Sequence, residues 1–237
     1  MNFLRIIPSL LISNKKLVKG VNFKNFKNAG SPFTTVAALD SQKADEIFII
    51  DKDSYNKKKK PDFKTLDKIA QVSSTPITFG GGIHDINTAK QVFLNGADKI
   101  FLNTVLFENK NIIKKISSIY GNQSIIGGIN IKKKNGKYYL LEDKTLSIDP
   151  VNYAKELEES GVAEIKINFV DLEGTKKGID VEYSKKINES VNIPCIFEGG
   201  IGSLDQISIF FENGLKAIAL GTIIIFSDYN IIKIKNF

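Results

Sequence analysis

The residues best suited to chemistry lie in two glycine-containing segments that share one internal spacing. The first segment is Pro76–Ile83 (PITFGGGI), and the second is Pro194–Ile201 (PCIFEGGI). Asn103-Thr104 follows the first segment, and Gly221-Thr222 follows the second at the same distance along the chain. The sequence therefore predicts two similar halves, each with a glycine turn and a later turn that contains threonine.

The chemistry that these turns indicate is phosphate binding. Glycines after a buried strand let the backbone approach an anion closely, and the next helix offers free N–H groups and a partial positive charge. One copy alone is equally typical of a tight strand-to-helix turn, but two copies at matched spacing favour a ligand with a phosphate at each end. The predicted phosphate-binding residues are Gly81, Gly82, Asn103, Thr104, Gly174, Gly199, Gly200, Gly221 and Thr222.

The elements that must position these turns alternate between buried strands and helical stretches along the whole chain. Eight such strand–helix units in 237 residues predict a single (β/α)8 TIM barrel domain, built from half-barrels of about residues 1–120 and 121–237. Ser13–Gly30 is expected to form a long polar loop, and Asn135-Gly136 predicts a hairpin turn. The expected strands are Leu4–Ile12, Glu46–Asp51, one that begins at Pro76, Lys99–Asn103, Ser124–Ile131, Glu164–Val170, Pro194–Glu198 and Lys216–Gly221.

The composition limits the classes of function. The sequence shows no apolar run long enough to cross a membrane and no signal-peptide pattern, so we expect a cytoplasmic protein without a membrane partner. One cysteine and one histidine exclude a disulfide framework and a Cys/His-rich metal site, and we expect neither metal nor cofactor. The formal charge of +7 is spread along the chain without a nucleic-acid-binding motif, which favours anionic ligands over nucleic acid.

Several short motifs follow one another along essentially the whole chain. They are Arg5–Pro8 (RIIP), Val18–Asn25 (VKGVNFKN), Ala44–Glu46 (ADE), Gly80–Ile83 (GGGI), Gly96–Lys99 (GADK), Asn103-Thr104 and Asp171–Thr175 (DLEGT). In order and spacing these motifs resemble the HisF family, the cyclase subunit of imidazole glycerol phosphate synthase. The resemblance implies a barrel that receives ammonia from a glutaminase subunit and uses it at the carboxyl ends of its strands.

Two positions depart from the family pattern where the resemblance implies acid–base chemistry. The family uses one aspartate at the end of strand 1 and one at the end of strand 5, and these positions hold Leu11 and Asn130 here. Leucine cannot transfer a proton, and an asparagine amide is not a usable base at neutral pH. We therefore expect no useful cyclase activity unless other groups substitute. The candidate catalytic residues are Asn130, Asp51, Asp171 and Lys19, with Glu173 as a further carboxylate.

The resemblance also implies an ammonia gate at the opposite end of the barrel. Arg5, Glu46, Lys99 and Glu164 align with a ring of charges at the amino ends of the strands, where two cations and two anions can pair. A purely structural layer of charges is the alternative. Asp98 resembles a residue that contacts the glutaminase. The apolar side chains expected to line a path for neutral ammonia are Phe48, Ile50, Ile77 and Ile126.

Three functions follow from these features. Pro8–Leu11 and Pro61–Phe63 resemble the WbuZ-like paralogues of sugar amidation, in which the barrel channels ammonia from a HisH-like glutaminase toward a sugar amidotransferase for surface polysaccharide. The second function is the imidazole glycerol phosphate cyclase of histidine biosynthesis. The third is a non-catalytic barrel that binds a phosphorylated ligand and activates a glutaminase. The glutaminase must be a separate partner, because Cys195 is expected in the core and His84 at the rim of the ligand site.

Overall fold

Eight parallel strands close into a barrel, which confirms the predicted (β/α)8 fold. The structure is a computed structural model that describes residues 4–55 and 59–237. Around the ring the strands follow the order β1, β4, β5, β6, β7, β9, β10 and β11, and β11 pairs with β1 to close it. Their bounds are β1 Arg5–Ser13, β4 Ile47–Asp51, β5 Ile77–Gly80, β6 Lys99–Leu102, β7 Ile125–Lys134, β9 Glu164–Phe169, β10 Cys195–Glu198 and β11 Ala217–Leu220.

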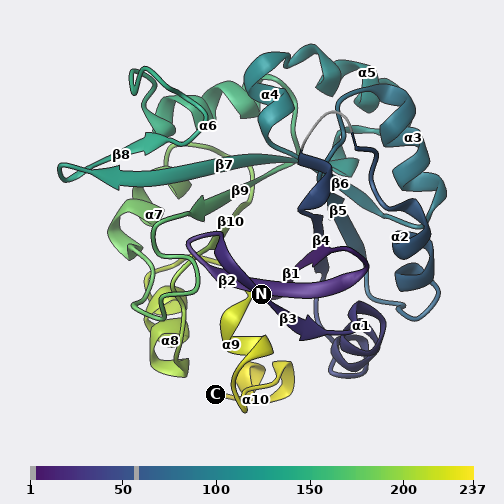
Figure 1. Cartoon of the computed structure of the whole chain (residues 1–237). Coiled ribbons are helices and arrows are strands. Elements are labelled where there is room, and N and C mark those ends of the chain that lie inside the picture. Colours follow the sequence, from purple (N-terminus) through teal and green to yellow (C-terminus); the bar gives the residue numbers. More distant parts are fainter. Residues whose placement is uncertain (1–3, 56–58) are drawn as a thin grey trace.

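Helices surround this ring of strands (Figure 1). Polar side chains cap the starts of two of them: Asp85 accepts a hydrogen bond from the Thr88 N–H before α3, and Ser203 accepts one from the Gln206 N–H before α8. The helices are α1 Pro32–Ser41, α2 Phe63–Ala70, α3 Ile86–Leu94, α4 Thr104–Glu108, α5 Asn111–Tyr120, α6 Pro150–Glu159, α7 Val181–Asn188, α8 Leu204–Glu212, α9 Thr222–Ile225 and α10 Ile231–Lys235.

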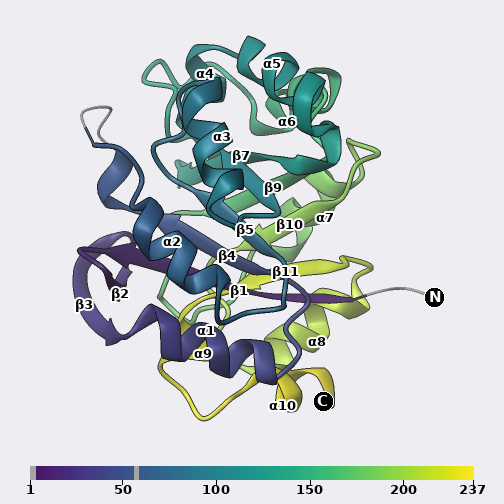
Figure 2. The same ribbon diagram turned by 90° about the vertical axis from the view of Figure 1, so that its right-hand side faces the viewer.

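Two hairpins extend the sheet at the C-terminal end of the barrel. After β1, strands β2 (Lys16–Val21) and β3 (Lys24–Gly30) pair with each other, and Figure 2 shows them at the end of the barrel opposite the start of β1. The expectation of a polar loop here was wrong, because Leu17 and Val18 are buried and anchor β2 to β1. After β7, strand β8 (Lys137–Leu140) returns through Asn135-Gly136, whose φ angles of 50° and 78° confirm the predicted hairpin turn.

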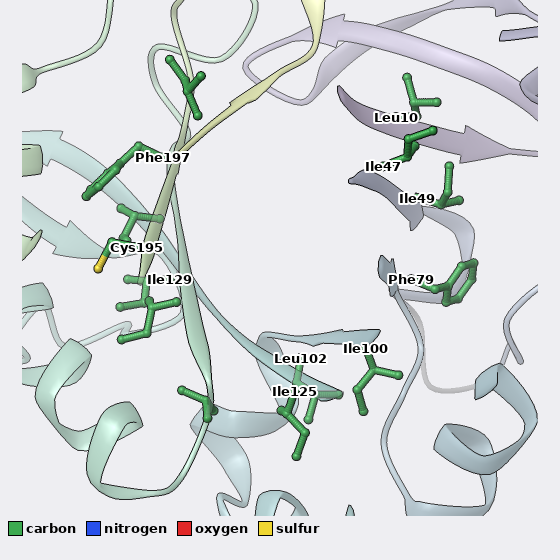
Figure 3. Close-up of a cluster of buried hydrophobic side chains, with 14 of the residues drawn as sticks. Leu10, Ile47, Ile49, Phe79, Ile100, Leu102, Ile125, Ile129, Cys195 and Phe197 are labelled. Atoms are coloured by element: carbon green, nitrogen blue, oxygen red, sulfur yellow. The ribbon is translucent and has the colours of Figure 1, made fainter. Parts of the chain in front are cut away.

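The alternation of side chains along the strands separates two apolar clusters. The larger lies between the strands and the helices, and Figure 3 shows several of its members spread around the ring of strands. A smaller cluster fills the barrel interior. Ile77 belongs to the outer cluster, so its expected interior position was wrong, and its neighbour Thr78 points inward and donates to Glu46. The interior cluster contains Ile7, Phe48, Ile126, Ile196, Ala217 and Ala219, with Ile50 and Phe101 packed on it.

Candidate functional site

The two glycine turns lie at the C-terminal ends of β5 and β10, where the backbone comes too close to its neighbours for a side chain. Gly81 has a φ of 103°, and Gly200 has a φ of 89°. A Cβ at Gly81 would overlap the carbonyl oxygen of Asp51, and one at Gly200 would overlap that of Gly178. Only glycine therefore fits at these positions, and the turns present bare backbone to the mouth of the barrel.

The turn after β10 borders a small cavity of about 10 Å³, roughly the space of one water molecule. Lys19 reaches the same place from the β2–β3 hairpin, since a Cβ at Gly221 would overlap its Nζ. The Thr222 hydroxyl is buried without a hydrogen-bond partner among residues 4–55 and 59–237. The structure thus brings one cation and one unpaired hydroxyl to the second predicted phosphate position. The predicted residues around this cavity are Gly174, Gly199, Gly200, Gly221 and Thr222.

The first predicted phosphate position is built in the same way. Gly80 pairs in register with Phe101, so the turn at Gly81-Gly82 and the pair Asn103-Thr104 end neighbouring strands. Asn103 directly precedes α4, as Gly221 directly precedes α9. Both ring nitrogens of His84 are buried, and neither has a hydrogen-bond partner in the described part of the chain. The two halves therefore present equivalent backbone turns to the mouth.

Two buried ion pairs lie inside the mouth; the sequence reasoning named the residues of one pair without pairing them and missed the other pair. Lys19 pairs with Glu173, and Lys166 of β9 pairs with Glu198 of β10. The exposed fractions of these four side chains are only 2–7%. Ser9 of β1 also hydrogen-bonds Glu198. A signal for the missed pair was present, since Lys166 follows the inward-facing Glu164 by two positions and Glu198 ends an apolar strand.

The two carboxylates of these pairs have oppositely shifted pKa values. Burial raises the pKa of Glu173 above its ordinary value, although Lys19 opposes this effect. Burial also acts on Glu198, but Lys166 and Lys19 together bring its pKa below the ordinary value. Two carboxylates whose pKa values are shifted in opposite directions therefore border the same cavity, an arrangement that suits acid–base chemistry.

Lys166 also changes the expected character of the barrel interior. Its ammonium group lies 5.4 Å from the centre of the Phe48 ring and 5.1 Å from that of Phe101, within the interior cluster. The interior is thus apolar around Ile7 and Ile126 but carries a paired cation between the two ends of the barrel. The predicted apolar lining residues Phe48, Ile50 and Ile126 are thus joined in the interior by a buried, paired lysine, which the sequence reasoning did not foresee.

Asp51, a predicted catalytic residue, is used to hold its own loop. Its Oδ1 accepts hydrogen bonds from the N–H groups of Asp53 and Ser54, at 2.9 and 3.3 Å. Its Oδ2 accepts from the Ser54 hydroxyl at 2.6 Å and from the Asp62 N–H at 3.0 Å. Asp51 is also 5% exposed. These contacts indicate that the carboxylate stabilises the segment between β4 and α2.

Asp171 and the β2–β3 hairpin meet at the rim of the mouth. The side-chain amide of Asn22 donates to the Asp171 carbonyl oxygen at 2.6 Å, and the Asn22 N–H donates to the Glu173 carbonyl oxygen at 2.9 Å. The Asp171 carboxylate accepts from the Lys133 N–H at 3.2 Å, while its Oδ1 is buried and unpaired within the described residues. The hairpin is therefore fastened over the mouth, with Lys19 pointing into it.

The two positions that depart from the family pattern have different surroundings. Leu11 lies in β1, is 8% exposed and pairs with Ile50 in register. Asn130 lies in β7 and donates through Nδ2 to Oε1 of Glu142 at 2.9 Å. Its Oδ1 accepts from the side chain of Asn168 in β9 at 3.3 Å. The sequence reasoning missed Glu142, which belonged to a polar excursion without a distinctive motif.

At the opposite end of the barrel, four charges form a closed ring. Arg5 contacts Glu46 at 2.6 Å and Glu164 at 2.5 Å, while Lys99 contacts Glu46 at 3.2 Å and Glu164 at 2.5 Å. Burial opposes ionisation of Glu164, but Arg5 and Lys99 together hold its pKa below the ordinary value. The structure thus brings together all four residues of the predicted gate, and each cation touches both carboxylates.

Asp98 lies beside this ring and is exposed. Its Oδ2 accepts a hydrogen bond from the Ile77 N–H at 2.8 Å, so the carboxylate helps to hold the start of β5. Asp45 does the same for β1, since its Oδ2 accepts from the Ile6 N–H at 2.9 Å. A contact between Asp98 and a partner stays a prediction.

Cys195 is buried in β10, and burial raises the pKa of its thiol to about 12. A thiol that stays protonated is a poor nucleophile, so Cys195 is a core residue, as expected. Over residues 4–55 and 59–237, no group of three or more histidine, cysteine or acidic side chains is arranged to hold a metal ion. In the same residues, no helix is long and apolar enough to cross a membrane.

Comparison with known proteins gives consistent matches over nearly the whole chain. The family of histidine biosynthesis proteins matches residues 5–230. An imidazole glycerol phosphate synthase subunit HisF from Sulfurisphaera tokodaii is 36% identical over 92% of this chain and 88% of its own length. Proteins of the same name from Pyrococcus furiosus and Clostridium botulinum are 34% and 33% identical, each over 98% of this chain and 94% of their own lengths.

Proposed function

Because the chain belongs to the family of histidine biosynthesis proteins, we propose that it is the synthase subunit of an imidazole glycerol phosphate synthase. In this proposal a HisH-like glutaminase docks at the end of the barrel that carries Arg5 and Lys99. Ammonia then passes through the barrel to a phosphorylated substrate at the mouth. The observation that carries the proposal is the closed four-charge ring, which lies at the end opposite the glycine turns.

The ring suits a gate because its two cations are paired but only partly buried. The side chains of Arg5 and Lys99 are each 23% exposed, whereas those of Glu46 and Glu164 are 3% and 10% exposed. The cations therefore face the surface on which a partner would dock, and the carboxylates face the interior. If the Lys99 side chain moves away, Arg5 still contacts both carboxylates, so the ring can open without leaving them unpaired.

The interior pair of Lys166 and Glu198 fits the transfer of neutral ammonia. An ammonium ion that moved along the barrel would approach the buried Lys166 cation, and like charges repel strongly where water is excluded. Neutral ammonia meets no such barrier and can donate to Glu198 as it passes. This pair would therefore favour delivery of the nucleophilic, uncharged form.

The mouth offers groups that suit the phosphate of the product named for the relatives. An imidazole glycerol phosphate carries one phosphate, and the turn at Gly199-Gly200 offers backbone, the Thr222 hydroxyl and Lys19 as a counter-ion. The present cavity holds about one water molecule, so the hairpin that carries Lys19 must shift to admit the ligand.

The test is reconstitution with a HisH-like glutaminase. We expect the wild-type complex to hydrolyse glutamine faster than the glutaminase alone and to release imidazole glycerol phosphate, and we expect the isolated barrel to do so with ammonium chloride. Absence of that product with both glutamine and ammonium chloride would contradict the proposal. Failure with glutamine but success with ammonium chloride would contradict only the docking.

Sugar amidation is the second candidate, and Leu11 is the observation that favours it. Leucine at this position leaves β1 without the carboxylate that the resemblance implies for cyclisation. The relatives named above cover nearly the whole chain, so imidazole formation is placed first. A complex that passes ammonia from glutamine to a sugar amidotransferase, but forms no imidazole product, would reverse this order.

A further inference from the structure

The carboxylate of Glu142 lies beside Asn130 of β7, the position at which the resemblance implies an aspartate. Glu142 follows β8, and the backbone N–H of its neighbour Leu141 donates to the Asn130 carbonyl oxygen at 2.9 Å, which fixes this segment against β7. The Glu142 side chain then accepts from the Asn130 side chain at 2.9 Å. The acidic group is therefore one hydrogen bond away from the residue that replaces the aspartate.

A second observation at this place points to a bound molecule. Asn168 of β9 is 5% exposed, and its Oδ1 is buried with no hydrogen-bond partner in the described residues. Its Nδ2 is already used, because it donates to Oδ1 of Asn130. A buried acceptor of this kind is costly unless a donor fills it. Asn168 also lies two positions beyond Lys166 on the inward face of β9, where ammonia leaving the barrel would arrive.

We propose that Glu142 is the carboxylate that transfers protons at the mouth of this barrel, in place of the aspartate absent at Asn130. In the same arrangement, Oδ1 of Asn168 accepts an N–H of the incoming ammonia. This inference rests on the proposed synthase function, and it names the group that makes the reaction feasible without the family's aspartates.

The chemistry assigned to Glu142 is balanced in protons. When ammonia attacks a carbonyl carbon, a C–N bond forms and the C=O π electrons move to oxygen. Glu142 takes one proton from nitrogen and returns it to that oxygen, which gives an amino alcohol. Repeating the transfer from nitrogen to the hydroxyl breaks the C–O bond, releases water and leaves a C=N bond. No oxidant or reductant is needed, and Glu142 ends as it began.

The surroundings of Glu142 support this role. Burial raises its pKa above the ordinary glutamate value, and the hydrogen bond from Asn130 only partly opposes this. Tyr153 of α6 is one titratable group near it. Lys110 lies 4.9 Å from the centre of the Tyr153 ring and pairs with Glu156. A carboxylate with a raised pKa is better matched to both accepting and donating a proton near neutral pH.

The experiment compares four proteins, each supplied with ammonium chloride and the open-chain precursor from which the relatives form imidazole glycerol phosphate. Glu142→Gln keeps an oxygen that can accept from Asn130 but cannot transfer a proton. We expect its kcat to fall about 100-fold or more with little change in KM, since a positioned acid or base contributes roughly 10²–10⁴-fold. The low-pH limb of the wild-type rate profile should disappear as well.

Two further variants separate chemistry from folding. Glu159→Gln removes the same charge from an exposed site on α6 and should leave the rate unchanged. Asn130→Asp in the Glu142→Gln background returns a carboxylate to β7 and should recover at least about tenfold of the lost rate. An unchanged pH profile in Glu142→Gln, or no recovery in the double variant, overturns the inference while the proposed function stands. If the wild-type protein forms no product, the proposed function fails and this inference fails with it.

Discussion

The buried pair of Lys166 and Glu198 gives the sharpest test of the interior. Lys166→Met keeps a similar volume but removes the charge, so Glu198, which is 6% exposed, loses its direct partner. The remaining cation nearby is Lys19, which is already paired with Glu173. Breaking a buried pair in this way typically costs about 3–5 kcal/mol, because one charge stays buried without compensation. That loss corresponds to a rise of roughly 100-fold to several thousand-fold in the unfolded fraction.

The pH dependence of this loss has a definite sign. In the wild-type protein the pKa of Glu198 lies below its ordinary value, so its contribution to stability is present above about pH 4.3 and is lost as pH falls through the folded pKa. In Lys166→Met, burial without a partner raises that pKa above the unfolded value. The variant should therefore be least impaired at low pH and should lose stability as pH rises from about 4.3.

The measurement is a series of urea unfolding curves between pH 4 and 8 for three proteins. The control is Lys166→Met combined with Glu198→Leu, which removes both charges and should recover most of the lost free energy of unfolding. Equal stability of the single and double variants at pH 7 would refute the reasoning. A single variant that becomes more stable as pH rises would refute it as well.

Two other predictions concern the two ends of the barrel. Lys99→Ala removes a cation that touches both carboxylates of the ring. Product formed from glutamine should therefore fall severalfold, while product formed from ammonium chloride should change little. An equal fall with both nitrogen sources would argue against a gate. Gly200→Ala places a Cβ on the Gly178 carbonyl oxygen, so the affinity for imidazole glycerol phosphate, measured by calorimetry, should fall at least tenfold. Gly214→Ala is the control for backbone strain, because Gly214 has a φ of 82° but open space around it, and this variant should bind normally.

The architecture could be predicted from the sequence because its signals are local and repeated. Strand and helix periodicity, together with the duplicated turns at Gly81 and Gly200, predict a barrel without any knowledge of contacts. The four ring residues were found through the resemblance, and their mutual pairing follows from their shared position at the amino ends of the strands. Because alternate side chains of a strand face the barrel interior, the position of a residue along its strand is enough to predict which way it points.

The chemistry of the mouth was harder to predict because it depends on contacts between distant segments. Lys19 and Glu173 are far apart in the sequence and meet only when the hairpin folds over the barrel. Glu142 sits in a polar excursion, where a glutamate is normally solvated, and only the pairing of β8 with β7 brings it to Asn130. The prediction for Ile77 was wrong because its neighbour Thr78 is the residue that faces the barrel interior, and adjacent residues of a strand point to opposite faces.

The positions that lack aspartate are consistent with the charges that surround them. Ser9 hydrogen-bonds Glu198, and Leu11 lies two positions farther along the same inward face of β1. The buried pairs nearby contain two ammonium groups and two carboxylates, so their charges balance. An aspartate at position 11 would add a third carboxylate beside them and leave one negative charge without a partner. Acidic groups lie on β10, after β9 and after β8 in this barrel, and the apolar Leu11 on β1 adds no further charge to the two balanced pairs.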